Sequence, residues 1–242
     1  MMKLKFKSRT LVFLSLVIIL LWGCKKNDTA SLPALGYSYF PLVEGSTNYY
    51  QVDSIGWLGY TYDPATGTIE IDTVSYQVRE VVDGFFTDNE GRETAKIIRY
   101  RRNISTDPWV LYKVYSANIT STRAERYEDN VRYIKLIFPP VNGEKWTGQY
   151  LDVPASDTAF DAWEYEYESI NVPEDIGTFS FDSVLTVTQK NEINLIEFRL
   201  YQEQYAAGTG LVSKNYKDLE YLNTVSSFIK NGFIYKETLI KP

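Results

Sequence analysis

From residue 37 onward the chain alternates apolar and polar side chains with a period of two, which is typical of half-buried β-strands. The same pattern predicts strands at 49–55, 68–78, 96–102, 109–119, 122–128, 131–138, 162–171, 178–189, 193–205 and 210–217. Turn residues separate several of these strands, at Asp83-Gly84, 89–91 and Asp129-Asn130. The pattern therefore predicts an all-β fold with ten or more antiparallel strands and at most one short helix.

The C-terminal segment allows two interpretations. Asn231-Gly232 lies between two β-rich runs, and Asn-Gly in that setting is the strongest short signal for a hairpin. The alternative is a helix across 217–229, one face of which would carry Leu219, Leu222, Val225 and Ile229. β-branched and aromatic residues crowd 224–235, so the hairpin is favoured.

The first residues have a different character. Four basic residues within 3–9 precede an apolar run at 11–22, which is too short for the roughly 20 residues that a membrane-spanning helix needs. A basic start followed by a short apolar core predicts a secretory signal peptide over 1–23. The polar residues that follow, up to 36, predict a tether, and no shift in composition divides 37–242, so we expect one domain there.

The signal ends in Leu21-Trp22-Gly23-Cys24, which resembles the lipobox of bacterial lipoproteins. The resemblance implies cleavage before Cys24 and attachment of acyl chains, palmitate among them, to its sulfur and its new amino group. The alternative is an uncleaved anchor with a buried cysteine. Asp after the cysteine would resemble an inner-membrane retention signal, and Lys25 stands there instead, so the resemblance points to the outer membrane, facing either side.

Four segments of the predicted domain resemble uncharacterised lipoproteins that are common in the Bacteroidota. They are Tyr39-Phe40-Pro41-Leu42 with Gly45, then 50–55, 181–187 and 203–212. The resemblance implies an all-β lipoprotein with a strongly curved antiparallel sheet or an open barrel, lipocalin-like or sandwich-like. It implies no activity.

The segment 40–45 has an echo at 138–143, because both read Phe-Pro-x-Val-x-Gly. One interpretation is the duplication of a half-domain. The other, which we favour at this point, is two similar entries into strands, with Pro keeping the backbone extended and Gly allowing a turn.

Composition limits the chemistry. The 242 residues include no His and one Cys, which excludes His-dependent acid–base catalysis, Cys/His zinc sites and internal disulfides. Removing 1–23 takes away four basic and no acidic residues, leaving 21 basic and 31 acidic residues and a net charge of −10. That balance argues against a nucleic-acid partner, and it leaves membrane attachment to the acyl chains.

Two charge clusters are candidate sites. One consists of Arg99, Arg101 and Arg102, which could form an anion site, although pairing with carboxylates is favoured. As a strand, 163–168 places Glu164, Glu166 and Glu168 on one face, which would suit calcium or a glycosidase carboxylate pair. We expect instead a solvated row, with Arg99 and Arg101 as cross-strand partners, and no metal or cofactor.

The aromatic residues and the hydroxyl residues raise the question of sugars. Trp57, Trp109 and Trp163 are candidate ligand-binding aromatics, although we expect them in the core. Asp-Ser/Thr-apolar tripeptides resemble an O-glycosylation sequon of exported Bacteroidota proteins, with Thr29 and Thr158 as the candidate acceptors.

These observations favour a non-enzymatic, lipid-anchored envelope protein that binds a ligand, such as an apolar one in its curved sheet, or assembles with partners. The first alternative is a surface glycan-binding module that uses exposed aromatics. The second is a His-free hydrolase built on carboxylates.

Overall fold

The computed structural model describes residues 35–242 except 64, 66–67, 149–162 and 223–227, and these residues belong to one compact unit, Ala34–Pro242. After a short 3₁₀ turn, Tyr37–Tyr39, the described chain forms twelve strands. They are β1 Thr47–Asp63, β2 Thr68–Thr87, β3 Glu93–Arg102, β4 Val110–Ile119, β5 Arg123–Glu128, β6 Val131–Ile137, β7 Lys145–Thr147, β8 Glu164–Ile176, β9 Phe179–Ile193, β10 Glu197–Ala206, β11 Gly210–Tyr221 and β12 Ile229–Lys241. The all-β prediction is confirmed.

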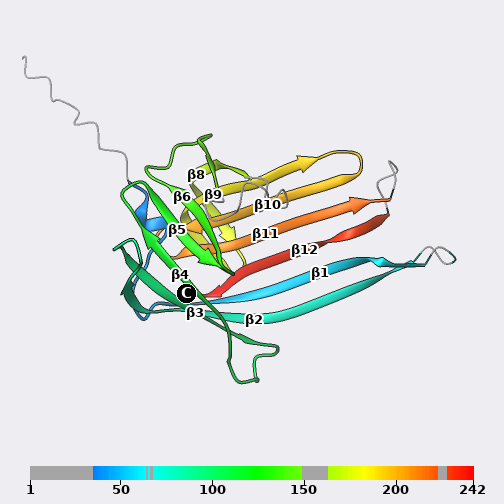
Figure 1. Ribbon diagram of the computed structural model, residues 1–242, viewed down its shortest axis with the longest axis horizontal. Helices are drawn as coiled ribbons and strands as arrows, with labels where there is room; N and C mark the ends of the chain where they lie inside the picture. Colours follow the sequence, from blue (N-terminus) through cyan, green and yellow to red (C-terminus); the bar gives the residue numbers. More distant parts are fainter. Residues whose placement is uncertain (1–34, 64, 66–67, 149–162, 223–227) are drawn as a thin grey trace, which may run out of the picture. The chain divides into compact units, whose positions relative to one another are not determined.

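All twelve strands belong to one antiparallel sheet in the order β6-β5-β4-β3-β2-β1-β12-β11-β10-β9-β8-β7 (Figure 1). The two ends of this order approach each other. Ile134 N of β6 donates a hydrogen bond to Gly148 O at 2.7 Å, and Trp146 Nε1 of β7 donates to Ile134 O at 2.9 Å. The sheet is therefore a nearly closed barrel.

Because neighbouring strands are antiparallel, alternate connections lie at opposite ends of the barrel. We call the end at which β1 begins and β12 finishes the entry end. The 3₁₀ turn and the connections β2–β3, β4–β5 and β10–β11 lie at this end (Figure 1). At the opposite end, the connections β5–β6 and β9–β10 reverse the chain.

The core consists of two buried clusters in which aromatic and β-branched residues predominate. The larger is built around Tyr165, Tyr167, Leu136, Leu185 and Val187, each 2% exposed or less. The smaller is built around Tyr50, Val52, Val78, Val212 and Leu239. These residues occupy the alternate positions that the period-two pattern assigns to the inside of a sheet.

The first Phe-Pro-x-Val-x-Gly motif forms a tight turn just before β1. Gly45 has a φ of +81°, and Ser46 N donates to Val43 O at 3.0 Å. Gly45 N then donates to Val82 O at 2.8 Å, and Val82 N donates back to Ser46 O at 3.1 Å. The motif thereby hydrogen-bonds to the end of β2.

The second motif repeats this arrangement before β7. Gly143 has a φ of +78°, and Glu144 N donates to Val141 O at 3.0 Å. Gly143 N donates to Tyr167 O at 2.8 Å, and Tyr167 N donates back to Glu144 O at 3.1 Å. Each motif opens a meander of six strands, β1–β6 and β7–β12. This equivalence favours the duplication that sequence alone ranked second.

Two predicted turns are wrong. Asp83-Gly84 lies inside β2, where the register shifts between Val82 and Gly84, so the glycine serves a bulge rather than a hairpin. Asn231-Gly232 lies inside β12, opposite β11 and β1. No hairpin turn forms there. Gly232 instead lies where two strands approach each other closely, as glycine inside a strand often does.

The connection from β11 to β12 lies earlier than predicted. Leu222 N donates to Phe228 O at 3.1 Å, and Leu219 pairs with Gly232 as part of β11. The helix alternative is therefore wrong for its described residues, whereas Val225 lies outside them. The short strand β7 was not predicted because three residues show no period.

Candidate functional site

The cross-strand register brings charged residues to the inner face of the barrel. Val52 is opposite Glu237 of β12, Glu237 is opposite Lys214 of β11, and Lys214 is opposite Glu203 of β10. Directly opposed residues of neighbouring strands share a face. Val52 is fully buried, and the three charged side chains lie in line with it inside the barrel.

Eight interior residues join into one continuous series of ion pairs, which we call the ion-pair chain. It runs from Glu237 through Arg99, Glu80 and Arg126 to Glu128, and Lys135 and Lys214 then each join Glu128 to Glu203. No side chain of the eight is more than 15% exposed. Four cations face four carboxylates, so the ion-pair chain has no net charge.

The arginine half of the ion-pair chain is densely bonded. Arg99 donates to Glu237, and its Nε lies 3.3 Å from Glu80. Arg126 donates to both oxygens of Glu80, at 3.0 and 2.6 Å, and its Nε lies 2.8 Å from Glu128. Bidentate pairing of this kind fixes both side chains in one geometry.

The lysine half is organised around one carboxylate oxygen. Lys135 Nζ donates to Glu203 Oε1 at 3.1 Å, and Lys214 Nζ lies 3.3 Å from the same atom. The two ammonium groups also lie 3.6 and 3.9 Å from the carboxylate of Glu128. The lysines therefore bridge Glu128 and Glu203.

Three tyrosines complete the coordination at the two ends of the ion-pair chain. Tyr205 and Tyr216 donate from their hydroxyls to the two oxygens of Glu203, at 2.5 and 2.6 Å. Tyr235 donates to Glu237 at 2.6 Å. Buried carboxylates are tolerated when donors of this kind replace water.

The surroundings keep these groups ionised. Burial alone would raise the pKa of the Glu203 carboxyl, but Lys135 and Lys214 outweigh it and lower the pKa from 4.5 to about 2. Glu128 has its pKa lowered by the same lysines and by Arg126, against the effect of burial. Burial would lower the pKa of Lys214, whereas Glu128 and Glu203 raise it above the ordinary value.

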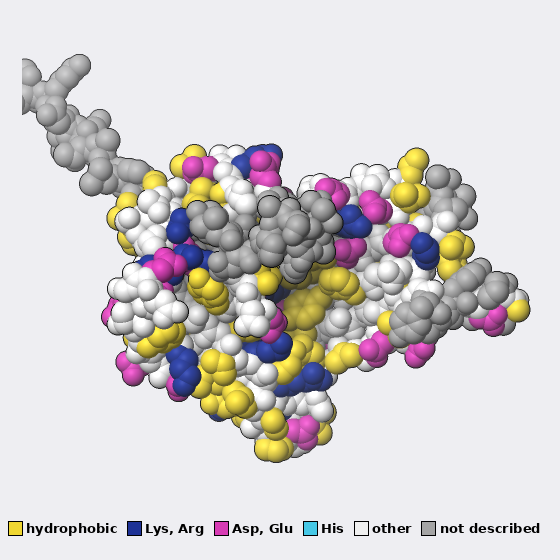
Figure 2. Space-filling view, in the orientation of Figure 1, with side chains coloured by type: hydrophobic (Ala, Val, Ile, Leu, Met, Phe, Trp, Pro, Cys, Tyr) yellow, Lys and Arg dark blue, Asp and Glu magenta, His cyan; other side chains and the backbone are white. Residues whose placement is uncertain are grey.

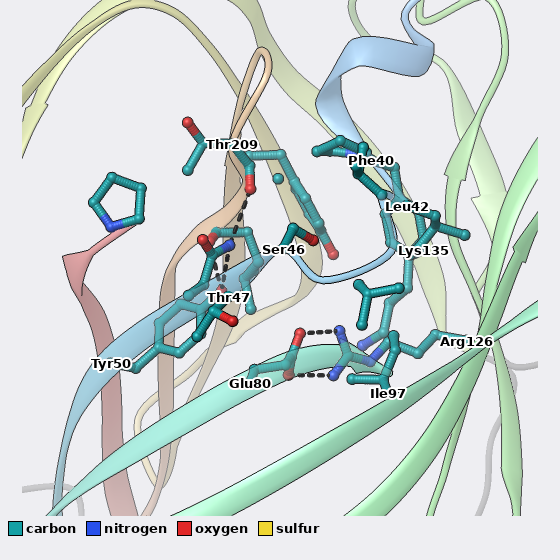
Figure 3. A pocket seen from close by; sticks show the side chains of 18 of the residues that line it. Phe40, Leu42, Ser46, Thr47, Tyr50, Glu80, Ile97, Arg126, Lys135 and Thr209 are labelled. Atoms are coloured by element: carbon teal, nitrogen blue, oxygen red, sulfur yellow. Dashed lines mark hydrogen bonds and ion pairs between the residues drawn. The ribbon is translucent and has the colours of Figure 1, made fainter. Parts of the chain in front are cut away.

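A cavity of about 410 Å³ lies on the entry-end side of the ion-pair chain (Figure 3). Its apolar wall consists of Phe40, Pro41, Leu42, Val82, Ile97 and Leu211. Its charged floor consists of Glu80, Arg126, Glu128, Lys135, Glu203 and Lys214. At its rim Asn48 Nδ2 donates to Thr209 O at 3.1 Å, which ties β1 to the β10–β11 turn. The volume lies within the range of small-molecule sites.

A second hollow of about 270 Å³ lies on the other side of the ion-pair chain. Aromatic side chains line most of it, namely Tyr76, Tyr112, Tyr115, Tyr216, Phe233 and Tyr235. Glu128 and Lys214 line both hollows. The ion-pair chain therefore separates an apolar cavity at the entry end from an aromatic hollow beyond it.

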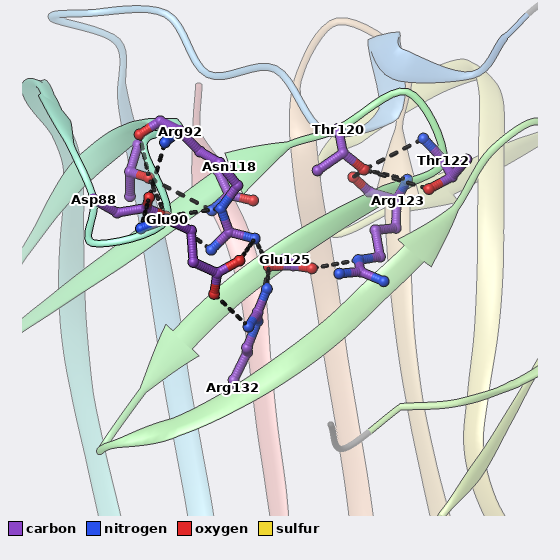
Figure 4. Close-up of polar contacts among 10 residues, drawn as sticks. Asp88, Glu90, Arg92, Asn118, Thr120, Thr122, Arg123, Glu125 and Arg132 are labelled. Carbon is purple, nitrogen blue, oxygen red and sulfur yellow. Dashed lines mark hydrogen bonds and ion pairs between the residues drawn. The ribbon is translucent and has the colours of Figure 1, made fainter. Parts of the chain in front are cut away.

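A separate buried charge cluster is centred on Glu125 of β5, whose side chain is fully buried (Figure 4). It accepts from Arg92 at 3.0 Å, from Arg132 at 2.8 and 2.5 Å, and from Arg123. Arg92 also pairs with Asp88 at 2.8 Å in the β2–β3 turn. This cluster joins that turn to β5 and β6, which is a structural role.

The predicted glutamate row lies on the outer face of β8, as expected. Glu164 pairs with Lys145 at 2.8 Å, and Glu166 lies 3.6 Å from the same lysine. Glu168 accepts from Thr188 and Gln202, each at 2.6 Å. The row is solvated.

The predicted partners of that row were wrong. Arg99 and Arg101 do share a face, but it is the inner face, away from the outward-facing glutamates. Arg99 pairs with Glu237 and Glu80, and the Arg101 guanidinium lies 3.9 Å from the ring centroid of Tyr76. The curvature of the sheet, which the sequence does not specify, decides which carboxylates an inward arginine meets.

The candidate tryptophans are half-buried and do not form one row. Trp57 lies in β1, opposite Gly232. Trp109 precedes β4, with the guanidinium groups of Arg79 and Arg102 at 5.4 and 4.3 Å from its ring. Trp163 packs its ring against Tyr201 at 4.7 Å. No two of the three are in contact in the described structure.

The remaining predicted sites, Cys24, Thr29 and Thr158, lie outside the described residues. Within the described ranges, no group of three or more Asp, Glu, Cys or His side chains is arranged to hold a metal ion. The same ranges contain no helix long and apolar enough to cross a membrane. On the face in view, acidic and basic side chains are interspersed, and apolar side chains gather in its central hollow (Figure 2).

Apart from Arg99, sequence reasoning missed the ion-pair chain. A signal was present, because several of these charges stand in phase with apolar positions. Glu203 lies between Tyr201 and Tyr205, and Glu237 lies between Tyr235 and Leu239. A charge in the inward phase of a strand indicates a buried, paired group.

No protein-family model matches the chain, and no curated protein matches it. Among solved structures, the chain is similar to a candidate exported protein with a YmcC-like fold from Bacteroides fragilis, at 12% identity and a TM-score of 0.32. The match covers 83% of this chain and 96% of that chain.

Proposed function

We propose that the protein is a lipid-anchored protein of the outer membrane that binds a small amphipathic molecule in the entry-end cavity without chemical conversion. The observation that carries this proposal is the cavity itself, which is lined both by apolar side chains and by ion-paired ones. A site of that kind fits a molecule with one apolar part and one polar part.

The titration behaviour of the interior supports binding rather than catalysis. A hydrolase built on two carboxylates needs one of them protonated at neutral pH, which requires a raised pKa. The pKa values of Glu80, Glu128 and Glu203 are lowered instead, since the neighbouring cations outweigh the effect of burial. These three carboxylates are therefore suited to fixed ion pairs and not to proton transfer.

The position of the cavity supports a membrane-derived ligand. Phe40 and Pro41, which line the cavity, lie close to the start of the described chain at Leu35. With an acylated Cys24, ten residues of the predicted tether, 25–34, would join the anchor to the described chain. Fully extended, ten residues reach at most about 36 Å. The entry end would then stay within a short distance of the lipid surface.

The lipid anchor has a direct test. We expect Cys24→Ser to abolish incorporation of labelled palmitate and to leave the precursor uncleaved, because the acylated sulfur is the substrate of the processing step in lipoproteins. Labelling followed by gel analysis of the full chain measures both. Continued processing and labelling of the variant would refute the anchor.

The binding function is tested by native mass spectrometry of the protein purified from its own membrane. Ser46 is an exposed residue at the cavity lining, so Ser46→Trp fills the mouth without removing a core contact. We expect the wild type to retain a small molecule and Ser46→Trp to lose it. Glu44→Trp, two residues away and not part of the lining, is the matched control and should retain it. Equal spectra for all three proteins, with or without adducts, would contradict a ligand in this cavity.

A further inference from the structure

The charge inventory of the cavity floor is balanced. Among the described lining residues, three cations face three carboxylates, namely Arg126, Lys135 and Lys214 against Glu80, Glu128 and Glu203. Each belongs to the ion-pair chain, in which every charge has an opposite charge within 4 Å. The floor is therefore ionic but carries no net charge.

A floor of this kind does not favour the binding of a ligand that carries a net charge. Bringing an ion out of water is expensive unless an opposite charge is available to compensate it. Here the cations are already committed to Glu80, Glu128 and Glu203. The lowered pKa of Glu203 also means that the floor does not easily take up a proton to accommodate an anion.

Around Glu203, the floor nevertheless offers more hydrogen-bond donors than that carboxylate accepts. Glu203 Oε1 is approached by three donors, from Lys135 at 3.1 Å, Lys214 at 3.3 Å and Tyr216 at 2.6 Å. A carboxylate oxygen has about two acceptor positions, so the two ammonium groups, with three N–H bonds each, cannot all be satisfied there.

From this balance we propose, on the basis of the proposed function, that the polar part of the bound molecule has no net charge and is rich in acceptor oxygens. An uncharged polyhydroxyl group and a zwitterionic phosphodiester both meet this description. The acceptor oxygens lie against Lys135 and Lys214. The apolar part lies along Phe40, Leu42 and Leu211, which line the same cavity.

The test compares amphiphiles that share one dodecyl chain and differ only in the head group. Full chain carrying Cys24→Ser is titrated calorimetrically with dodecyl maltoside, dodecylphosphocholine, dodecyl sulfate and dodecyltrimethylammonium, each below its micelle concentration. We expect the maltoside and the phosphocholine to bind at least about tenfold more tightly than either charged amphiphile, a difference of about 1.4 kcal/mol. Tightest binding of the sulfate or of the trimethylammonium compound would overturn the proposal.

Charge variants reverse the preference if the balance is its cause. Lys214→Met leaves one uncompensated negative charge, so dodecyltrimethylammonium should gain affinity relative to the wild type. Glu203→Gln leaves one positive charge, so dodecyl sulfate should gain. Unchanged rankings in folded variants would overturn the proposal, and the wild-type series decides it alone if a variant does not fold.

Different results would contradict the proposed function and the head-group inference. If no amphiphile binds, or if Ser46→Trp binds all four as the wild type does, the cavity is not the site and the proposed function fails. If binding depends on Ser46 but follows a net charge, only the head-group inference fails. Supplying dodecylphosphocholine within lipid vesicles instead of in solution distinguishes a ligand taken from a bilayer from a free ligand. Extraction from vesicles requires the entry end to meet the membrane.

Discussion

At the scale of single residues, the unusual feature is the burial of ionised groups within a sheet that otherwise follows a simple apolar pattern. Glu203 and Glu237 are fully buried, as is Glu125 in the separate cluster. Each is held by at least two donors, which replace the lost hydration. Removing one partner from such a pair leaves a buried, uncompensated charge, and that loss is what mutation should reveal.

Arg99→Met should destabilise the protein by about 3–5 kcal/mol, because it leaves the buried carboxylate of Glu237 without its cation. Denaturant unfolding measures the free energy. Adding Glu237→Gln to this variant should restore part of the loss. The control is Lys96→Met, which breaks a pair with Asp83 whose side chains are 48% and 42% exposed, and it should cost less than about 1 kcal/mol. Similar losses for Arg99→Met and Lys96→Met would show that the interior pairs are not buried in solution.

Stability should also depend on acid in a defined range. The pKa of Glu203 is lowered from 4.5 to about 2 by Lys135 and Lys214. Its stabilising effect is complete above pH 4.5 and is lost as the pH falls toward 2, because protonation then favours the unfolded chain. Glu203→Gln lacks this group, so its melting temperature, although lower at pH 7, should fall less than that of the wild type between pH 4.5 and 2. Parallel curves would be inconsistent with an ionised, paired Glu203.

At the scale of strands, the sequence predicts most of the structure, because a half-buried strand imposes its period directly on the residues. The runs at 68–78, 109–119 and 131–138 lie within or nearly coincide with β2, β4 and β6. What it does not predict are features that depend on a neighbouring strand. Asn231-Gly232 has the composition of a hairpin turn. The glycine nevertheless lies inside β12, where the neighbouring strand β11 approaches closely. The sequence does not predict the ion-pair chain for the same reason, since its residues come from seven strands.

Gly232 therefore provides an element-scale test. It has a φ of +128°, and a Cβ atom there would lie 2.0 Å from Asp218 O of β11. Gly232→Ala should cost about 1–3 kcal/mol or more, because both the backbone conformation and the strand spacing must change. Gly56→Ala is the matched control in β1, where a Cβ would lie 3.9 Å from Asp72 O, an ordinary contact. Equal losses for Gly232→Ala and Gly56→Ala in unfolding measurements would contradict the close approach of β11 and β12 at Gly232.

At the scale of the whole described unit, two six-stranded meanders with equivalent entry motifs enclose one interior. Both motifs lie at the entry end, but only the first, 40–45, contributes apolar residues to the cavity wall. The C-terminal residue, Pro242, lines the same cavity. The start and the finish of the barrel thus meet at the site.

The central claim is that an amphipathic molecule binds inside the entry end, and photo-cross-linking tests it most directly. The full chain carrying Cys24→Ser is irradiated with a dodecyl maltoside that bears a diazirine on its alkyl chain, and the modified residues are mapped by mass spectrometry. The account predicts adducts on Phe40, Leu42 and Leu211, and their loss in Ser46→Trp but not in Glu44→Trp. Adducts confined to exposed apolar residues of β4, such as Val110 and Val114, which are 62% and 55% exposed, would contradict it.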